Sequence, residues 1–197
     1  MNLPHYFLAD LPPEAALSPR MIAEACDTLK RNREKFLASR STEDVVKILC
    51  EVAADWLQPE NKFRRFALAS APAETGFSPP VLARGLDDFF RRFTPANFQA
   101  LLVQDLGAAD AKPFWRGPHL LAHVAAGNLP NPALMSLTLG LLTRSANFMK
   151  CASAAAFLPR LFAHSLYEAD RKLGACLEIA AWRGGNLELE NALFAEA

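Results

Sequence analysis

The sequence predicts an α/β fold in which a mainly helical N-terminal region, residues 1–110, precedes the first part of a parallel-sheet domain, residues 111–197. The first 106 residues read almost entirely as helices, and from Gly117 onward short apolar runs alternate with helical patterns. Two of these runs end in loops that contain glycine and asparagine. Repeated strand–loop–helix units build parallel sheets, which bind ligands in the loops beyond the carboxyl ends of the strands.

Five helices are expected before residue 107. They begin near residues 18, 41, 61, 77 and 94. Ser18-Pro19 illustrates the start signal, because serine caps the first turn and proline suits a position inside it. The third helix is expected to end at the loop 72–76, where Pro72 interrupts the pattern.

The second half contains the strands. We expect strands over His119–Ala126, Ser145–Lys150 and Ala175–Trp182, with helices over Ala133–Leu142, from Ala155, and over Asn186–Ala197. The loops Gly127–Pro132 and Lys150–Ala154 then lie at the ligand-binding ends of the first two strands. Because a further strand is expected after the last helix, we expect the polypeptide to be a fragment of a longer protein.

Composition excludes several classes of function. The 21 basic and 21 acidic residues balance, so nothing indicates nucleic acid or an anionic membrane surface. No apolar run reaches the ~18 residues of a transmembrane helix, and no secretory signal opens the chain. The four cysteines lie far apart without a C-x-x-C pair, which disfavours zinc clusters and indicates free thiols in a cytoplasmic protein.

Gly127 and Asn128 follow the first expected strand and have two interpretations. One is a plain turn, because glycine and asparagine tolerate left-handed backbone angles and Pro130 prevents a helix from continuing. The other is a functional loop, in which Gly127 lets a ligand approach the backbone and the Asn128 amide orients a reacting carbonyl group.

Lys150 ends the second expected strand. It is either a solvated strand terminus or a cation that binds the ribose hydroxyls or a phosphate of a ligand. Cys151 beside it is a candidate thiol, but no histidine lies near it in sequence and a structural role is favoured. Gly184-Gly185 after the third strand either cradles a phosphate or forms a turn. No G-x-G-x-x-G fingerprint occurs.

His119 and His123 are the remaining candidates for a metal site. Residues four apart in a strand lie roughly 13 Å from each other. We therefore expect no shared metal and predict no metal site in the chain.

Two stretches resemble the acyl-CoA reductase family of bacterial bioluminescence (LuxC-like). They are GFSPPVLARGLDDFFRRFTPANFQALLVQDLG, residues 76–107, and HLLAHVAAGNLPNPALMSLTLGLLTRSANFMK, residues 119–150. The combination of G-N-x-P-x-x-x-L with a downstream L-L-x-(R/K)-x-A-N-x-x-K is moderately specific. The family supplies fatty aldehyde for luciferase and is related to aldehyde dehydrogenases.

The resemblance, which covers about residues 60–197, implies an aldehyde-dehydrogenase-like fold with a Rossmann-like cofactor domain. It implies an NADPH-dependent reduction of a long-chain fatty acyl-CoA to the aldehyde through a cysteine acyl-enzyme. Asn128 matches the asparagine that positions the carbonyl oxygen, and Lys150 matches the lysine that contacts the adenosine ribose. Ser153 stands where many NAD-preferring relatives carry a glutamate, and its lack of charge allows NADPH.

The resemblance also implies that Gly127 adjoins the cofactor and that Gly184 and Gly185 lie near the loop beneath the adenine. The family's nucleophilic cysteine is expected beyond this chain, so the chain alone should be inactive. The expected partners are an acyl-CoA or other acyl thioester, an acyl-transfer enzyme and further copies of the chain. The competing interpretation is a non-catalytic partner-binding module with a degenerate α/β half-domain.

Overall fold

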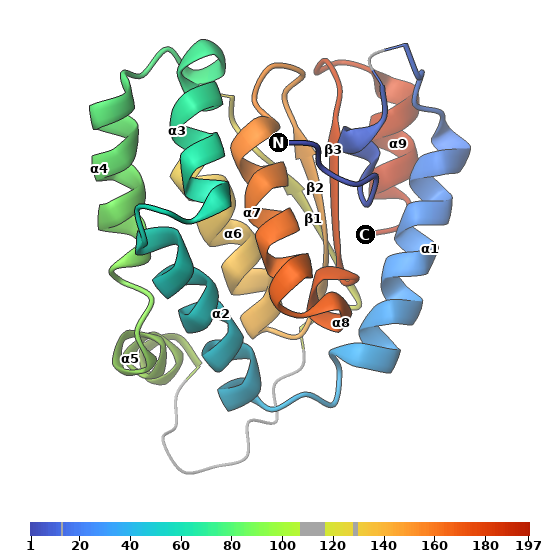
Figure 1. Ribbon diagram of the computed structural model, residues 1–197. Coiled ribbons are helices and arrows are strands. Elements are labelled where there is room, and N and C mark those ends of the chain that lie inside the picture. The colour runs from blue at the N-terminus through green and yellow to red at the C-terminus, as the bar shows by residue number, and fades with distance from the viewer. Residues whose placement is uncertain (13, 107–116, 128–129) are drawn as a thin grey trace.

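A three-stranded parallel sheet lies at the centre of the computed structural model, which describes residues 1–12, 14–106, 117–127 and 130–197 (Figure 1). Its strands are β1 (Leu120–Val124), β2 (Ala146–Cys151) and β3 (Leu177–Ala181), paired in sequence order. The register aligns Val124 with Lys150, and Lys150 with Ala180. All three strands therefore end at the same edge of the sheet, here called the carboxyl edge. The predicted α/β class is confirmed.

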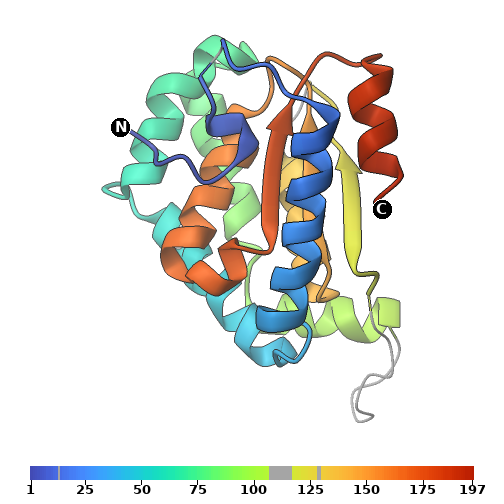
Figure 2. The same cartoon turned by 90° about the vertical axis from the view of Figure 1, so that its right-hand side faces the viewer.

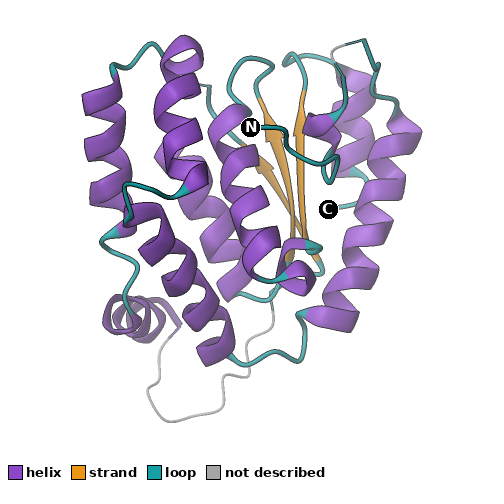
Figure 3. Ribbon diagram, viewed as in Figure 1, coloured by secondary structure: helices purple, strands orange, loops and turns teal. Residues whose placement is uncertain are grey.

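Helices surround the sheet, and several begin where the sequence supplies a capping side chain (Figure 3). Ser18, Ser41 and Asn61 each accept a hydrogen bond from a backbone amide in the first turn of the next helix. The helices are α1 (Pro19–Phe36), α2 (Thr42–Leu57), α3 (Lys62–Thr75), α4 (Pro79–Phe90), α5 (Pro95–Leu106), α6 (Pro130–Leu142), α7 (Phe157–Ala169), α8 (Arg171–Gly174) and α9 (Leu187–Phe194), with a 3-10 segment η1 (Leu8–Asp10).

Different helices cover the two faces of the sheet. Helices α1 and α9 lie on one face and α6 and α7 on the other, while α2, α3 and α4 form an outer layer (Figures 1 and 2). Side chains alternate along β2, so Phe148 packs in the core beneath α1 and α9, and Met149 packs in the core on the opposite face. The N-terminal helices thus share their cores with the sheet. A domain boundary near residue 110 stays a prediction.

The expected break at Pro72 is wrong, because α3 continues through Pro72 to Thr75. Pro72 has no amide to donate to the carbonyl one turn earlier, so the helix lacks one backbone hydrogen bond there. The turn beyond the proline still closes, because the Pro72 carbonyl accepts a hydrogen bond from the Gly76 amide at 3.0 Å. The helix ends at Gly76, whose φ of 73° suits glycine. The first helix ends at Phe36. None of the described helices is long and apolar enough to cross a membrane.

A half-buried polar network joins α6 to β1 and β2. His123 Nε2 lies 2.8 Å from the Asn147 side-chain oxygen, and His123 Nδ1 lies 2.6 Å from Ser136 Oγ. Because the Asn147 amide nitrogen donates to the Ser145 carbonyl, His123 must donate through Nε2 and accept from Ser136. Burial lowers the pKa of His123, which favours this neutral tautomer. Gly140 makes room for the network on α6.

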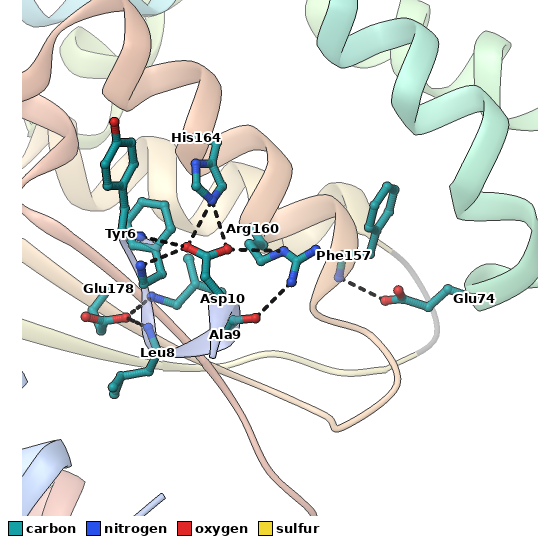
Figure 4. Close-up of polar contacts among 11 residues, drawn as sticks. Tyr6, Leu8, Ala9, Asp10, Glu74, Phe157, Arg160, His164 and Glu178 are labelled. Atoms are coloured by element: carbon teal, nitrogen blue, oxygen red, sulfur yellow. Dashed lines mark hydrogen bonds and ion pairs between the residues drawn. The ribbon is translucent and has the colours of Figure 1, made fainter. Parts of the chain in front are cut away.

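Hydrogen bonds hold the N-terminal segment against α7 and β3 (Figure 4). Asp10 accepts hydrogen bonds from the amides of Tyr6 and Phe7 and lies 2.9 Å from His164 Nε2 on α7. Burial opposes the ionisation of Asp10, but these hydrogen bonds outweigh it and lower its pKa. On β3, the Glu178 carboxyl accepts a hydrogen bond from the Leu8 amide at 2.7 Å. Burial raises the pKa of Glu178 to about 8.

Gly140→Ala is expected to destabilise the fold by about 3 kcal/mol or more, because overpacking a rigid core costs 1–3 kcal/mol and occasionally more. A Cβ at Gly140 would lie 1.6 Å from the Asn147 side-chain oxygen, which is held by His123. The matched control is Gly85→Ala on α4, where a Cβ meets nothing within 4 Å. The control should gain up to about 1 kcal/mol from helix propensity. The free energies of unfolding of both variants are measured in urea. Equal values for Gly140→Ala and Gly85→Ala would contradict the close packing of Gly140 against this network.

Glu178→Gln is expected to flatten the pH dependence of stability. A carboxyl group whose pKa rises from 4.5 to about 8 on folding contributes stability that is complete below about pH 4.5 and is lost as the pH rises to about 8. The wild type should lose up to about 1.4 kcal/mol per pH unit from this group within that window. In Glu178→Gln, the side-chain oxygen still accepts the hydrogen bond from the Leu8 amide, but the loss of stability with rising pH should disappear.

Asp10→Asn is the control for this pH dependence. The lowered pKa of Asp10 gives stability that is lost only at acid pH, so the variant should be less stable throughout pH 5 to 8. It should keep most of the slope, because the charge of Asp10 makes the smallest contribution to the raised pKa of Glu178. Unfolding in urea across this range measures both variants. A slope that persists in Glu178→Gln would show that another group causes it.

Candidate functional site

The loops at the carboxyl edge of the sheet touch one another. The Ala125 amide donates a hydrogen bond to the Lys150 carbonyl at 2.9 Å, which carries the chain after β1 alongside the end of β2. A Cβ placed at Gly127 would lie 3.3 Å from the Ala152 Cβ, so the two loops pack closely here. The structure therefore brings Gly127 next to the loop that contains Ser153, as the sequence predicts for neighbouring parallel strands.

Asn128, the candidate for carbonyl positioning, lies outside the described residues together with Leu129. Its role stays a prediction. Ser153 is exposed in the loop after β2 and carries no charge.

Lys150 occupies an unusual position on the central strand. The residue is only 7% exposed, and its ammonium nitrogen lies 5.6 Å from the centre of the Trp182 ring. Among the described residues, no carboxylate or hydrogen-bond acceptor pairs with this ammonium group. A buried cation usually has an anionic partner, because desolvation is costly. Lys150 is therefore not the solvated strand terminus that was one of its two interpretations.

Gly184 and Gly185 pass close to this lysine. A Cβ at Gly184 would lie 3.9 Å from the Lys150 ammonium nitrogen. Gly185 has a φ of 86°, a conformation that glycine adopts without strain. The amide of Gly185 donates to Glu190 on α9 at 3.0 Å. The Gly184-Gly185 turn thus places backbone atoms beside the Lys150 ammonium group, and neither glycine adds a side chain there.

The chain's own side chains occupy the N-termini of the two helices that follow β2 and β3. Glu74 on α3 accepts a hydrogen bond from the Phe157 amide at the start of α7, as Figure 4 shows. At α9, Asn186 accepts from the Leu189 amide. A ligand phosphate bound at either terminus would have to displace these acceptors. The Lys150 ammonium is not paired with a described carboxylate and remains available to an anion. Arg183, which follows Trp182, is a second and exposed cation at this edge.

The cysteines do not provide a nucleophile. Cys26, Cys151 and Cys176 are buried, and burial raises the pKa of each thiol to about 12. Cys50 is less buried, but burial raises its pKa as well. A thiol with such a pKa stays protonated near neutral pH and does not attack a carbonyl group. Cys151 accordingly takes the structural role that the sequence favours.

The two histidines have separate surroundings. His119 is exposed just before β1, with its Nδ1 3.7 Å from a carboxylate oxygen of Glu34. His123 is half-buried within the network with Asn147 and Ser136. No group of three potential metal ligands occurs in the part of the chain that the structure describes.

An apolar pocket of about 330 Å³ opens beside the carboxyl edge, between α4 and the first turns of α6 and α7. Its polar neighbour is Asn131, whose side chain donates to the Gly85 carbonyl at 3.2 Å. Gly85 leaves the pocket open because it has no side chain. The lining residues are Phe77, Val81, Leu82, Gly85, Leu86, Asn131, Pro132 and Leu158.

Sequence patterns did not identify this pocket or the contact between Lys150 and Trp182. The apolar stripe of α4 reads as ordinary core, because hydrophobic spacing does not tell a filled core from a cavity. Trp182 ends an apolar run 32 positions after Lys150 in the sequence, and only the parallel register of β2 and β3 joins the two.

A sequence profile of the family described as "Acyl-CoA reductase (LuxC)" matches residues 37–197. A comparison with curated protein sequences finds no significant match. Among solved structures, the chain is similar to the glyceraldehyde-3-phosphate dehydrogenase GapN from Methanocaldococcus jannaschii, crystallised in complex with NADP.

The similarity to GapN has a TM-score of 0.67 at 16% sequence identity, covering 90% of this chain and 39% of the GapN chain. At this identity the similarity concerns the fold alone. The fold is aldehyde-dehydrogenase-like, as expected. The profile match covers most of the sequence, and this chain therefore belongs to the acyl-CoA reductase (LuxC) family.

Proposed function

We propose that this chain forms the cofactor-binding part of an NADPH-dependent long-chain fatty acyl-CoA reductase. The observation that carries the proposal is Lys150, a buried ammonium group without an acidic partner among the described residues, at the carboxyl edge of a parallel sheet. Family membership supports an acyl-CoA as the substrate class. The similarity of the fold to an enzyme crystallised with NADP supports a nicotinamide cofactor.

The residues of the carboxyl edge fit the adenosine half of such a cofactor. The Lys150 ammonium donates hydrogen bonds to ribose oxygens or to a 2′-phosphate. Gly127 and Gly184 let the cofactor approach the backbone. Ser153 places no carboxylate in the loop after β2, so a 2′-phosphate meets no repulsion from this side chain.

The reaction divides between this chain and a thiolate outside its four cysteines. That thiolate attacks the thioester carbonyl carbon, and the tetrahedral oxyanion collapses to an acyl-enzyme with release of CoA thiolate. The Asn128 amide is proposed to donate a hydrogen bond to the oxyanion. When bound, NADPH supplies a hydride for the acyl carbon. Collapse of the resulting thiohemiacetal anion releases the aldehyde and regenerates the thiolate.

The apolar pocket beside Asn131 and Pro132 is proposed to receive part of the acyl chain. Its volume of about 330 Å³ falls at the lower end of the range for ligand pockets, about 300–1,000 Å³. Asn131 and Pro132, which line the pocket from the first turn of α6, follow the proposed oxyanion donor by three and four positions in the sequence. An acyl-transfer enzyme and further copies of the chain stay proposed partners, and a cytoplasmic location stays a prediction.

Lys150→Met and Asn128→Ala are expected to have separable effects in the protein that carries the nucleophilic cysteine. Lys150→Met keeps the apolar stem and removes one charge-assisted hydrogen bond, worth about 1.5–3 kcal/mol or roughly 10- to 150-fold in NADPH affinity. Asn128→Ala should leave this affinity almost unchanged and slow acylation by about 100- to 1000-fold. Calorimetric titration and single-turnover acylation measure the two effects. The opposite pattern of effects would refute both assignments.

Gly85→Leu is expected to shorten the acyl chain that the protein binds. The leucine side chain would point into open space, so the helix should tolerate it, while each displaced methylene costs about 0.8 kcal/mol, about fourfold in affinity. Tetradecanoyl-CoA should then bind at least about 15-fold more weakly if two methylenes are displaced, and butyryl-CoA should bind as before. Gly85→Ala serves as the control that leaves the pocket open. Equal losses for both thioesters would place the acyl chain elsewhere.

A further inference from the structure

Trp182 follows directly after β3 and lies on the same face of the sheet as Lys150. Its backbone amide donates to the Cys151 carbonyl at 3.3 Å, which fixes its position beside the end of β2. Its ring packs against Phe148, with the ring centres 6.3 Å apart. The ring is 5% exposed and lies beneath the Lys150 ammonium group, 5.6 Å from its nitrogen.

An indole at this site is less favourable than a phenyl ring unless it interacts with the Lys150 ammonium group. Its ring nitrogen is buried and has no hydrogen-bond partner among the described residues, which costs stability that a phenylalanine would avoid. Tryptophan, however, attracts a cation to its ring face more strongly than phenylalanine or tyrosine does. The geometry therefore favours an electrostatic reason for the indole.

We propose that Trp182 is a positioning residue that holds Lys150 in place without neutralising it, and so sets the preference for a cofactor carrying a 2′-phosphate. This inference rests on the proposed function. A carboxylate in the place of the ring would also hold the ammonium group, but it would cancel most of the charge that a phosphate meets. The aromatic ring attracts the cation through its quadrupole and leaves the net charge at +1.

Gly184 completes the arrangement on the outer side. A Cβ there would lie 3.9 Å from the Lys150 nitrogen, so an aspartate at this position brings a carboxylate into contact range. Gly184 is exposed and its φ is not positive, so a side chain is compatible with its backbone. This position offers a direct way to neutralise the ammonium group without touching the core.

The test compares adenosine 2′,5′-bisphosphate with adenosine 5′-monophosphate, which differ only in the 2′-phosphate, by calorimetric titration of the 197-residue chain. The unmodified chain should prefer the bisphosphate by about tenfold or more, the value of one charge-assisted hydrogen bond. Gly184→Asp should reduce the preference to about one, because the new carboxylate pairs with Lys150. Gly184→Asn has the same size without the charge. It should weaken both nucleotides by the same factor, because its side chain restricts their approach to the backbone, and it should keep the preference.

Trp182→Leu should lower the preference severalfold, and Trp182→Phe should lower it by a smaller factor, because a phenyl ring attracts a cation less strongly than an indole. In a Lys150→Met background, Trp182→Leu should leave the remaining preference unchanged, because the ring then has no cation to hold. If Trp182→Leu does not fold, the inference is tested by comparing Gly184→Asp with Gly184→Asn and by the preference of Trp182→Phe. A preference that survives Gly184→Asp, or a Trp182→Leu effect equal for both nucleotides, overturns the inference. Failure of both nucleotides and of NADPH to bind the unmodified chain would instead refute the proposed cofactor function.

Discussion

The burial of β2 between two helical layers is the constraint on which the rest of this structure depends. Every residue of this strand is buried, yet the strand contains both Asn147 and Lys150. Each polar side chain requires a partner, because an unsatisfied polar group in a low-dielectric core is costly. Asn147 obtains its partners from His123 and the Ser145 carbonyl, and Lys150 has the ring of Trp182. The two polar side chains of the central strand therefore require particular residues elsewhere, namely His123 on β1, Gly140 on α6 and Trp182 after β3.

The same strand separates a structural end from the end at which the cofactor is proposed to bind. Toward the interior, the Asn147 network is closed, since every group in it has a partner and Gly140 leaves no space for another atom. At the carboxyl edge the arrangement is open, since the Lys150 ammonium lies beneath a turn of two glycines. A rigid, fully satisfied interior next to an incompletely satisfied edge is the arrangement that preorganised binding sites require. The apolar pocket beside α4 lies next to this edge and extends the proposed site toward the acyl chain.

The N-terminal segment shows how a distant part of the chain reinforces this arrangement. Asp10 reaches His164 on α7, and the Leu8 amide reaches Glu178 on β3, so the segment bridges a helix and a strand (Figure 4). Glu74 reaches the first turn of α7 from α3. Asp10 and Glu74 thus contact α7, the helix that follows the loop containing Ser153. The loops at the carboxyl edge are thus held by contacts far from them in sequence.

The sequence by itself determined the class of fold, the family and the order of the elements. Serine and asparagine caps, apolar periodicity and glycine-containing loops are local signals, and they located the helices after Ser18 and Ser41 and all three strands. The sequence also singled out Lys150 and the glycine pair at 184 and 185, whose functional roles stay predictions. Only the tertiary structure decided that α3 continues through Pro72, since the turn beyond the proline closes between the Pro72 carbonyl and the Gly76 amide although one backbone hydrogen bond is missing. It alone decided the contact of Lys150 with Trp182, the His123 network and the pocket at Gly85, because each depends on side chains that meet across elements, and spacing along the chain does not encode such contacts.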